Sequence, residues 1–509
     1  MLPPVRPLFS SPLTYTPVLP TTLTSPPAVA RYRPLTLNAS ATFDQQVTDN
    51  INSTTTGREA DAISTVSLSL GLNEESRRTL LLADGTVGYQ KFWTSSDFDN
   101  SGLAVNSYGR GELIDQLLFV DGNFSTGQAF VNPALAPASN RASTAARTQI
   151  TTYDAGSYIT FDDLFNYLDV YLRARKAWVD FRGIAGATTP LPNATLEQER
   201  ARISTNAGIR PYQMIASGEN VRQQDGFRLY NGIFSLLLGQ ATGSQIIGRI
   251  GYENVQDIPS NVDIQGLLWS AGWQWRSAKN TSVRIEYGHR YGKPTWNGSA
   301  IIALTPKVYL IGNYLRTLES FQARLNRSLT DLIDQPTDES VGISALNPVQ
   351  PPILNGLLLT DDATFGLSWL IDAPVPQSVL PDLAATAAAP VTGVPQIYGA
   401  GSRLSLVAGY SHPRRISLAQ ETKDYQITGT YTRGLRRKLS LGISFSYIED
   451  HLINPAGPTS KSYRVSPALV YEINRSAAAS LSYSRLVRAT NGGGRVSENV
   501  VEFTIGTRL

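Results

Sequence analysis

The chain has 509 residues, 41% apolar and only 17% charged, with a formal net charge of +3, which excludes the strongly basic surface of a nucleic-acid-binding protein. No run approaches the roughly 18 consecutive apolar residues of a membrane-spanning helix, so a helical membrane protein is excluded. There is no cysteine, which excludes disulfides, thiolate metal sites and cysteine nucleophiles.

The N-terminal segment, residues 1–34, is rich in proline, as in MLPPVRPLFSSPLTYTPVLP. It contains no uninterrupted apolar core of the kind that an intact signal peptide has. We expect this segment to be extended or disordered, and we expect residues 35–509 to form a single domain.

Most of the remaining chain alternates between apolar and polar residues. In KLSLGISFSYI, residues 438–448, the odd positions are apolar and the even positions from 438 to 446 are small or polar. Residues 266–276, 282–291 and the final VVEFTIGTRL, residues 500–509, show the same period. Alternation with period two predicts strands whose two faces meet different surroundings, and segments of about 9–11 residues fit tilted strands that cross a membrane.

These segments predict an all-β fold: a transmembrane antiparallel up-and-down β-barrel of about 20 strands, within a range of 18–22. Long connections are expected near residues 183–226 and 327–400. Within the first, ATLEQERARIST, residues 194–205, has the best helical pattern of the chain, and YQMIASGENV, residues 212–221, is an alternative strand. A soluble β-rich binding protein is the competing interpretation, but no fixed repeat typical of a propeller or β-helix occurs.

The polar faces of the strands predict the wall of a lumen. An arginine that faces lipid near the membrane midplane costs about 2–4 kcal/mol, so charged residues should project inward. They would either form a selectivity lining for a polar solute or pair with each other and brace a wide barrel. The predicted lumen-lining residues are Arg284, Glu286, Arg290, Arg464, Glu472 and Arg508.

Aromatic residues gather near strand ends, as expected for girdles at the two membrane interfaces. The three histidines, at 289, 412 and 451, are too scattered to form a spaced metal motif, and His289 fits an interface position. The predicted interface aromatics are Trp273, Trp275, Tyr287, Tyr291, Tyr447 and Tyr471.

No catalytic, cofactor or metal site is predicted. The sequence has no G-x-S-x-G elbow, phosphate loop or dinucleotide fingerprint. The acid pairs Asp162/Asp163 and Asp361/Asp362 are adjacent in sequence, and neighbouring residues of a strand point in opposite directions. They therefore cannot serve together as the acid and base of a glycosidase, and we do not expect an enzyme.

Two stretches carry a family resemblance: YGRGELIDQLLFVDGNFSTGQAFVNPALAPAS, residues 108–139, and VRIEYGHRYGKPTWNGSAIIALTPKVYLIGNYLRTLES, residues 283–320. They resemble the PEP-CTERM (exosortase) system-associated outer membrane protein family, a porin-like β-barrel group. The chain departs from such barrels at Leu509, where an aromatic residue is usual.

The resemblance implies a barrel in the outer membrane of Gram-negative bacteria that is linked to exopolysaccharide export or surface assembly. Its implied partners are outer-membrane lipid, the barrel assembly machinery and a polysaccharide or another polar solute. We expect a passive porin-like channel, with a plugged structural barrel that scaffolds an envelope assembly as the alternative.

Overall fold

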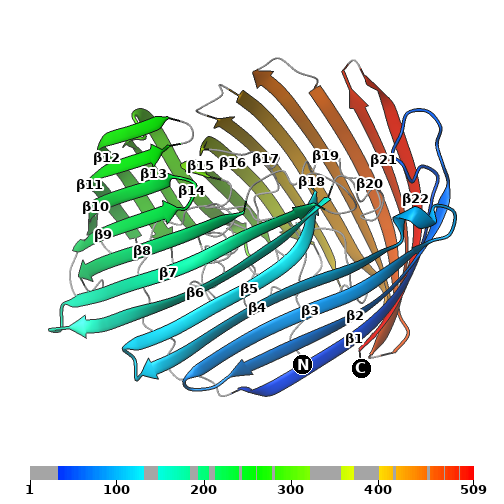
Figure 1. The fold of residues 1–509 in the computed structure, drawn as a ribbon, viewed down its shortest axis with the longest axis horizontal. Coiled ribbons are helices and arrows are strands. Elements are labelled where there is room, and N and C mark those ends of the chain that lie inside the picture. Colours follow the sequence, from blue (N-terminus) through cyan, green and yellow to red (C-terminus); the bar gives the residue numbers. More distant parts are fainter. Residues whose placement is uncertain are drawn as a thin grey trace.

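The computed structural model describes residues 33–508 except for 131–146, 184–192, 206–211, 240–242, 259–260, 278–280, 321–356, 372–400, 416–419, 455–458, 475 and 492. Over these residues the chain forms 22 β-strands and a short 3₁₀ helix, η1 (Ser96–Phe98) (Figure 1). No helix in the described part of the chain is long and apolar enough to cross a membrane. The strands are β1 (Arg33–Thr48), β2 (Asp61–Glu75), β3 (Thr79–Phe92), β4 (Asn100–Ile114), β5 (Leu118–Phe130), β6 (Arg147–Leu164), β7 (Leu168–Gly183), β8 (Ala194–Thr205), β9 (Tyr212–Gln223), β10 (Phe227–Gly239), β11 (Gly243–Asp257), β12 (Val262–Ser277), β13 (Thr281–Arg290), β14 (Lys293–Thr305), β15 (Val308–Ser320), β16 (Leu357–Leu370), β17 (Ser402–Arg415), β18 (Gln420–Arg436), β19 (Leu439–Asn454), β20 (Thr459–Glu472), β21 (Ala477–Thr490) and β22 (Gly493–Arg508).

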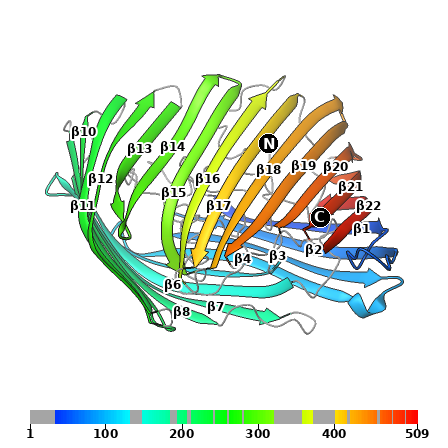
Figure 2. The same cartoon turned by 90° about the horizontal axis from the view of Figure 1, so that it is seen from above.

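Every strand pairs antiparallel with the next along the chain, and β22 pairs with β1. The seam runs from Ser40 opposite Arg508 to Thr48 opposite Val500. The sheet is thereby closed into a barrel, which Figure 2 shows from above, and each of the 22 described strands has a neighbour on both sides. The predicted fold class, an antiparallel up-and-down barrel, is confirmed.

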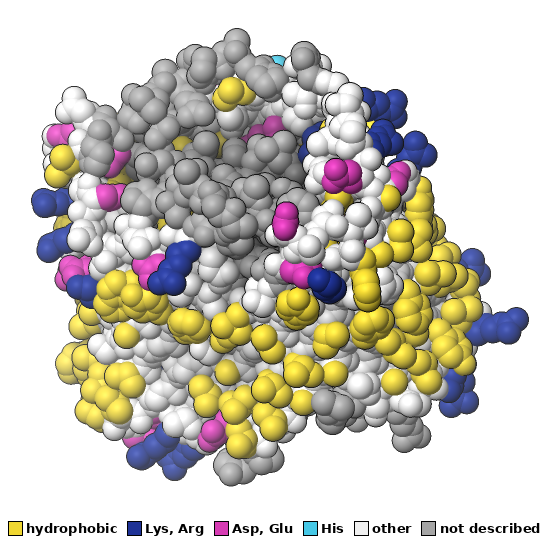
Figure 3. All heavy atoms as spheres, turned by 45° about the vertical axis from the view of Figure 1, so that its right-hand side comes forward, with side chains coloured by type: hydrophobic (Ala, Val, Ile, Leu, Met, Phe, Trp, Pro, Cys, Tyr) yellow, Lys and Arg dark blue, Asp and Glu magenta, His cyan; other side chains and the backbone are white. Residues whose placement is uncertain are grey.

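Each strand presents one face outward and one inward. In β22, Val501, Phe503 and Ile505 are exposed on the outside, whereas Thr504 points inward and donates a hydrogen bond to Asp44 of β1 across the seam (2.9 Å). On the face shown in Figure 3 the hydrophobic side chains form a band across the outside of the barrel, and charged side chains gather mainly along its edges. A closed barrel satisfies the backbone polar groups internally, so such an apolar outer face can meet lipid.

Two strands explain the difference between the expected 20 and the observed 22. Both β8 and β9 lie in residues 183–226, so the prediction of a long connection there is wrong. The helical pattern of residues 194–205 is misleading because β8 carries acids on its outer face, where Glu197 contacts Lys176 and Glu199 accepts a hydrogen bond from Asn220 (3.0 Å). Because β8 has polar residues on both faces, its sequence does not show the alternation of apolar and polar residues that is typical of a strand.

The other long segments are only partly described. Residues 357–370 of the predicted 327–400 connection form β16, and the remainder of that connection lies almost wholly outside the described residues. The predicted extended segment 1–34 also lies outside them, apart from its last two residues, which begin β1.

The barrel has two distinct rims. We call the rim where β1 begins and β22 ends the terminal rim, and the opposite one the far rim. Odd-numbered strands run from the terminal rim to the far rim, and even-numbered strands return. At the far rim, β13 and β14 are joined by a tight turn in which both Tyr291 and Gly292 have positive φ angles of 54° and 68°, as a two-residue hairpin turn requires.

The inner wall is not uniformly polar. Near the far rim, β7 to β11 present an apolar cluster inward that includes Val179, Phe181, Leu196, Phe227 and Val255. These side chains are buried, whereas the sequence predicted small or polar residues on the inner face. Burial within the barrel removes them from water, so their inward placement carries no solvation penalty.

Candidate functional site

The inner wall of β11 to β13 contains a cluster of charges centred on Glu286. The Glu286 side chain is only 1% exposed, and its carboxylate contacts Arg284 of the same strand (2.5 Å) and Arg249 of β11 (3.0 Å). The hydroxyl of Ser270 of β12 donates a hydrogen bond to the same carboxylate (3.1 Å). The structure thus brings two predicted lumen-lining residues, Arg284 and Glu286, together as a pair on the wall.

A glycine makes room for this cluster. Gly272 of β12 lies directly opposite Glu286. A Cβ atom at Gly272 would lie 2.4 Å from Cγ of Glu286 and 2.5 Å from the carbonyl oxygen of Ile285, closer than real Cβ contacts. The absence of a side chain at position 272 therefore allows the Glu286 carboxylate to lie flat against the wall and reach both arginines.

A second contact joins β11 to the turn after β13. Arg290 contacts Glu253 (3.3 Å), and the backbone N–H of Tyr291 donates to the other oxygen of Glu253. The Tyr291 side chain is only 7% exposed and belongs to the inner apolar cluster. The predicted interface position of Tyr291 is therefore wrong, because the left-handed turn ends the alternation of β13 and directs this side chain away from the outer surface.

A further charged cluster, not predicted from the sequence, lies on β5 to β7. Arg173 contacts Asp121, and Arg175 contacts Asp154 (2.5 Å), with all four side chains almost fully buried. Asp121 and Arg173 lie two strands apart, with β6 between them, where a Cβ on Gly156 would lie 3.0 Å from Oδ1 of Asp121. The signal available in the sequence is the pair of arginines at alternate positions of YLRARKAW, which places both on one face.

The remaining predicted lining residues lie elsewhere on the wall. Arg464 of β20 lies within electrostatic range of Glu498 of β22, whose buried carboxylate also accepts a hydrogen bond from Thr48 (3.2 Å). Glu472 is the last residue of β20, at the terminal rim. Arg508 is the last described residue of β22, and its side chain lies outside the described part.

The other predicted interface aromatics lie on the outer face. Trp273, Trp275 and Tyr471 are exposed toward the terminal-rim ends of β12 and β20. Tyr287 packs between Trp269 and Trp296 in the half nearer the far rim, and the rings of Tyr447 and Tyr463 lie 4.9 Å apart on β19 and β20.

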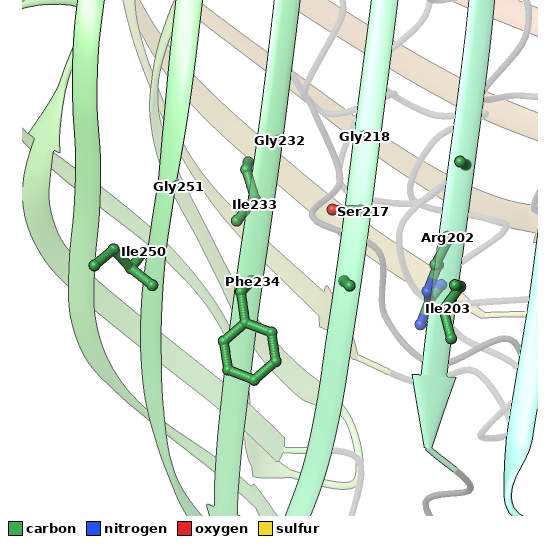
Figure 4. A pocket seen from close by; sticks show the side chains of 11 residues that line it. Arg202, Ile203, Ser217, Gly218, Gly232, Ile233, Phe234, Ile250 and Gly251 are labelled. Carbon is green, nitrogen blue, oxygen red and sulfur yellow. The ribbon is translucent and has the colours of Figure 1, made fainter.

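The outer face also contains a shallow groove of about 430 Å³ over β8 to β11 (Figure 4). Small residues, Gly218 and Gly232 among them, lie between the larger side chains of Ile203, Phe234 and Ile250. The groove is apolar and belongs to the outer belt, so it is unsuited to hold a polar solute.

The described residues contain no group of three or more His, Cys, Asp or Glu side chains arranged to hold a metal ion. The adjacent acids of β16 separate as expected for a strand. Asp361 contacts Arg316 (2.5 Å) and Arg414 (2.6 Å), whereas Asp362 accepts a hydrogen bond from Ser411 (2.6 Å). They do not form an acid–base pair.

The fold and its wall define a class: a closed antiparallel β-barrel with an apolar outer belt and a largely polar inner wall, the architecture of outer-membrane β-barrels. No protein-family model matches the chain, and no curated protein matches its sequence. Several solved structures have a similar fold. One is the siderophore receptor PirA from Pseudomonas aeruginosa, which is 10% identical; the match covers 94% of this chain and 81% of PirA, with a TM-score of 0.38. OccK2 (OpdF) from Pseudomonas aeruginosa matches at 9% identity over 93% and 98% of the chains, with a TM-score of 0.35. The copper transporter OprC matches at 10% identity over 95% and 82%, with a TM-score of 0.44.

Proposed function

We propose that this protein is a passive outer-membrane channel for a polar solute, without catalysis or a cofactor. The observation that carries the proposal is the closed 22-stranded sheet, with apolar side chains outside and charged and amide side chains inside. A barrel of more than about 16 strands is wide enough to enclose water unless a segment of the chain fills it.

A plugged scaffolding barrel is the second candidate, and the ion pairs of the wall favour it. The contacts of Glu286 with Arg249 and of Asp154 with Arg175 join different strands and brace the wall. Barrels of 22 strands are also of the size that commonly contains a plug.

The finer proposal is a link to exopolysaccharide export or surface assembly. It rests on the resemblance of residues 108–139 and 283–320 to the exosortase-associated barrel family. Outer-membrane lipid and the barrel assembly machinery are the partners that follow from the barrel class.

Single-channel conductance of the refolded protein in planar lipid bilayers tests the channel. We expect steady ohmic conductance, and we expect Arg284→Ala and Arg290→Ala each to shift the ion preference toward cations, because each removes a positive charge from the wall. Lys176→Ala, on the outer face, is the matched control and should leave the preference unchanged. Insertion with negligible conductance would instead support the plugged barrel.

A further inference from the structure

Near the far rim, the inner wall of β16 to β20 carries a row of oxygen-bearing side chains. In the register of the sheet, Asp362 lies opposite Ser411, Ser411 opposite Asp424, Asp424 opposite Asp450, and Asp450 opposite Ser460. Opposed residues of an antiparallel pair have Cβ atoms about 4.5–5.5 Å apart, so Asp424 and Asp450 are direct neighbours. Two carboxylates at this separation repel each other unless a proton or a cation lies between them.

A second observation concerns Asp424 by itself. Its side chain is only 1% exposed, yet within the described part of the chain neither carboxylate oxygen has a hydrogen-bond donor of regular geometry. Within the described residues, Oδ2 of Asp450 also has no hydrogen-bond partner, and the same holds for the buried hydroxyl oxygens of Thr422 and Ser460. Buried carboxylates normally accept hydrogen bonds or pair with a cation, so these oxygens together point to a missing positive partner.

Two acids elsewhere on the wall differ from this pair because each has an arginine partner. Asp154 and Glu286 each contact an arginine directly. Arg488 of β21 acts on Asp450 through its electric field. The third acid, Asp362, adds negative charge beside Ser411.

We propose that Asp424 and Asp450 bind a divalent cation of the calcium type at the far-rim end of the inner wall. Carboxylate and hydroxyl oxygens without nitrogen or sulfur ligands match the preference of Ca²⁺ and Mg²⁺. The ion would be held by two carboxylates, assisted by the Thr422 and Ser460 hydroxyls, and would keep part of its water shell. Ion binding at this site does not require an open pore, so a failure to bind calcium would leave the proposed channel function untouched.

Calorimetric titration of CaCl₂ into the full-length protein in detergent, after treatment with EDTA, tests this site. We expect one Ca²⁺ per chain with a dissociation constant of about 10⁻⁴–10⁻³ M, the range of extracellular calcium modules. Asp424→Asn and Asp450→Asn should each weaken binding at least tenfold. Asp263→Asn, which changes an exposed acid near the same rim on β12, should leave it unchanged.

Thermal unfolding of the same proteins provides a second readout. Without calcium, Asp424→Asn should unfold at a higher temperature than the wild type because the repulsion is removed, and added calcium should then raise only the wild-type midpoint. A wild-type protein that shows neither a calcium heat nor a calcium-dependent midpoint would overturn the proposal and leave a shared proton between the two acids. Equal loss of binding in Asp263→Asn would show adventitious surface binding and would also overturn it. If the asparagine variants fail to fold, the wild-type titration alone still decides.

Discussion

Replacement of Glu286 by glutamine is the most direct test of whether the charge cluster centred on Glu286 stabilises the barrel. The substitution keeps the shape of the side chain but removes the negative charge between Arg249, at 3.0 Å, and Arg284, at 2.5 Å. At an effective dielectric constant of about 20, two unit charges 3 Å apart interact by roughly 5 kcal/mol. Both arginines keep partial contact with solvent, which reduces this figure, and breaking a buried pair typically costs about 3–5 kcal/mol. We therefore expect Glu286→Gln to lose about 3 kcal/mol, or roughly 100-fold in the folding equilibrium.

Denaturant unfolding in detergent micelles, followed by tryptophan fluorescence, measures this loss. The double variant Glu286→Gln/Arg284→Gln should lose less than the sum of the two single variants, because the second substitution removes a charge that the first leaves unpaired. Glu197→Gln, which breaks the exposed outer contact with Lys176, is the control and should not change the midpoint. A loss below about 0.5 kcal/mol in Glu286→Gln would refute the reasoning, since it would mean that the two arginines do not need the carboxylate.

Three further substitutions test other parts of the structure. Gly272→Ala should destabilise the barrel by about 2–3 kcal/mol, because the new methyl group would collide with Glu286 and the backbone of β13. The folded fraction on a heat-modifiability gel measures this loss, and an unchanged fraction would contradict the close approach of β13 to Gly272. Ile250→Arg, in the middle of the outer face of β11, should cost about 2–4 kcal/mol in lipid vesicles, and a neutral effect would argue against a lipid-facing position. Tyr291→Ala should lower the free energy of unfolding by about 3 kcal/mol in denaturant, because the side chain is buried in the inner apolar cluster. A loss below about 1 kcal/mol would indicate that Tyr291 instead lies at the membrane interface.

The sequence predicts the barrel well because one physical rule governs nearly every strand. A strand between lipid and a polar interior must alternate, and residues such as Phe503 and Ile505 are exposed on the outer face for that reason. The rule fails where both faces are partly polar, as in β8, whose outer acids Glu197 and Glu199 imitate a helical pattern. It fails again at Tyr291, where the conformation of a two-residue turn decides the direction of the side chain.

The pairing of the inward charges was not predictable from one strand at a time. Alternation places Arg284 and Glu286 on the same face, but it does not reveal that Arg249 of β11 reaches the same carboxylate. Asp121 and Arg173 meet across Gly156 of the strand between them, where a Cβ would lie 3.0 Å from Oδ1 of Asp121. Such contacts depend on the register of neighbouring strands, which is set by turn lengths and by the whole sheet rather than by local pattern.

The central claim is that the outer face meets lipid and the inner face does not, and adjacent residues of β22 test it most directly. The chain has no cysteine, so Phe503→Cys and Thr504→Cys each introduce a single site for an environment-sensitive fluorophore. After refolding into vesicles that contain doxyl-labelled lipid, the label at position 503 should be strongly quenched and the label at position 504 should not. Equal quenching at the two positions, or quenching at neither, would contradict a membrane-spanning barrel with this orientation of its faces.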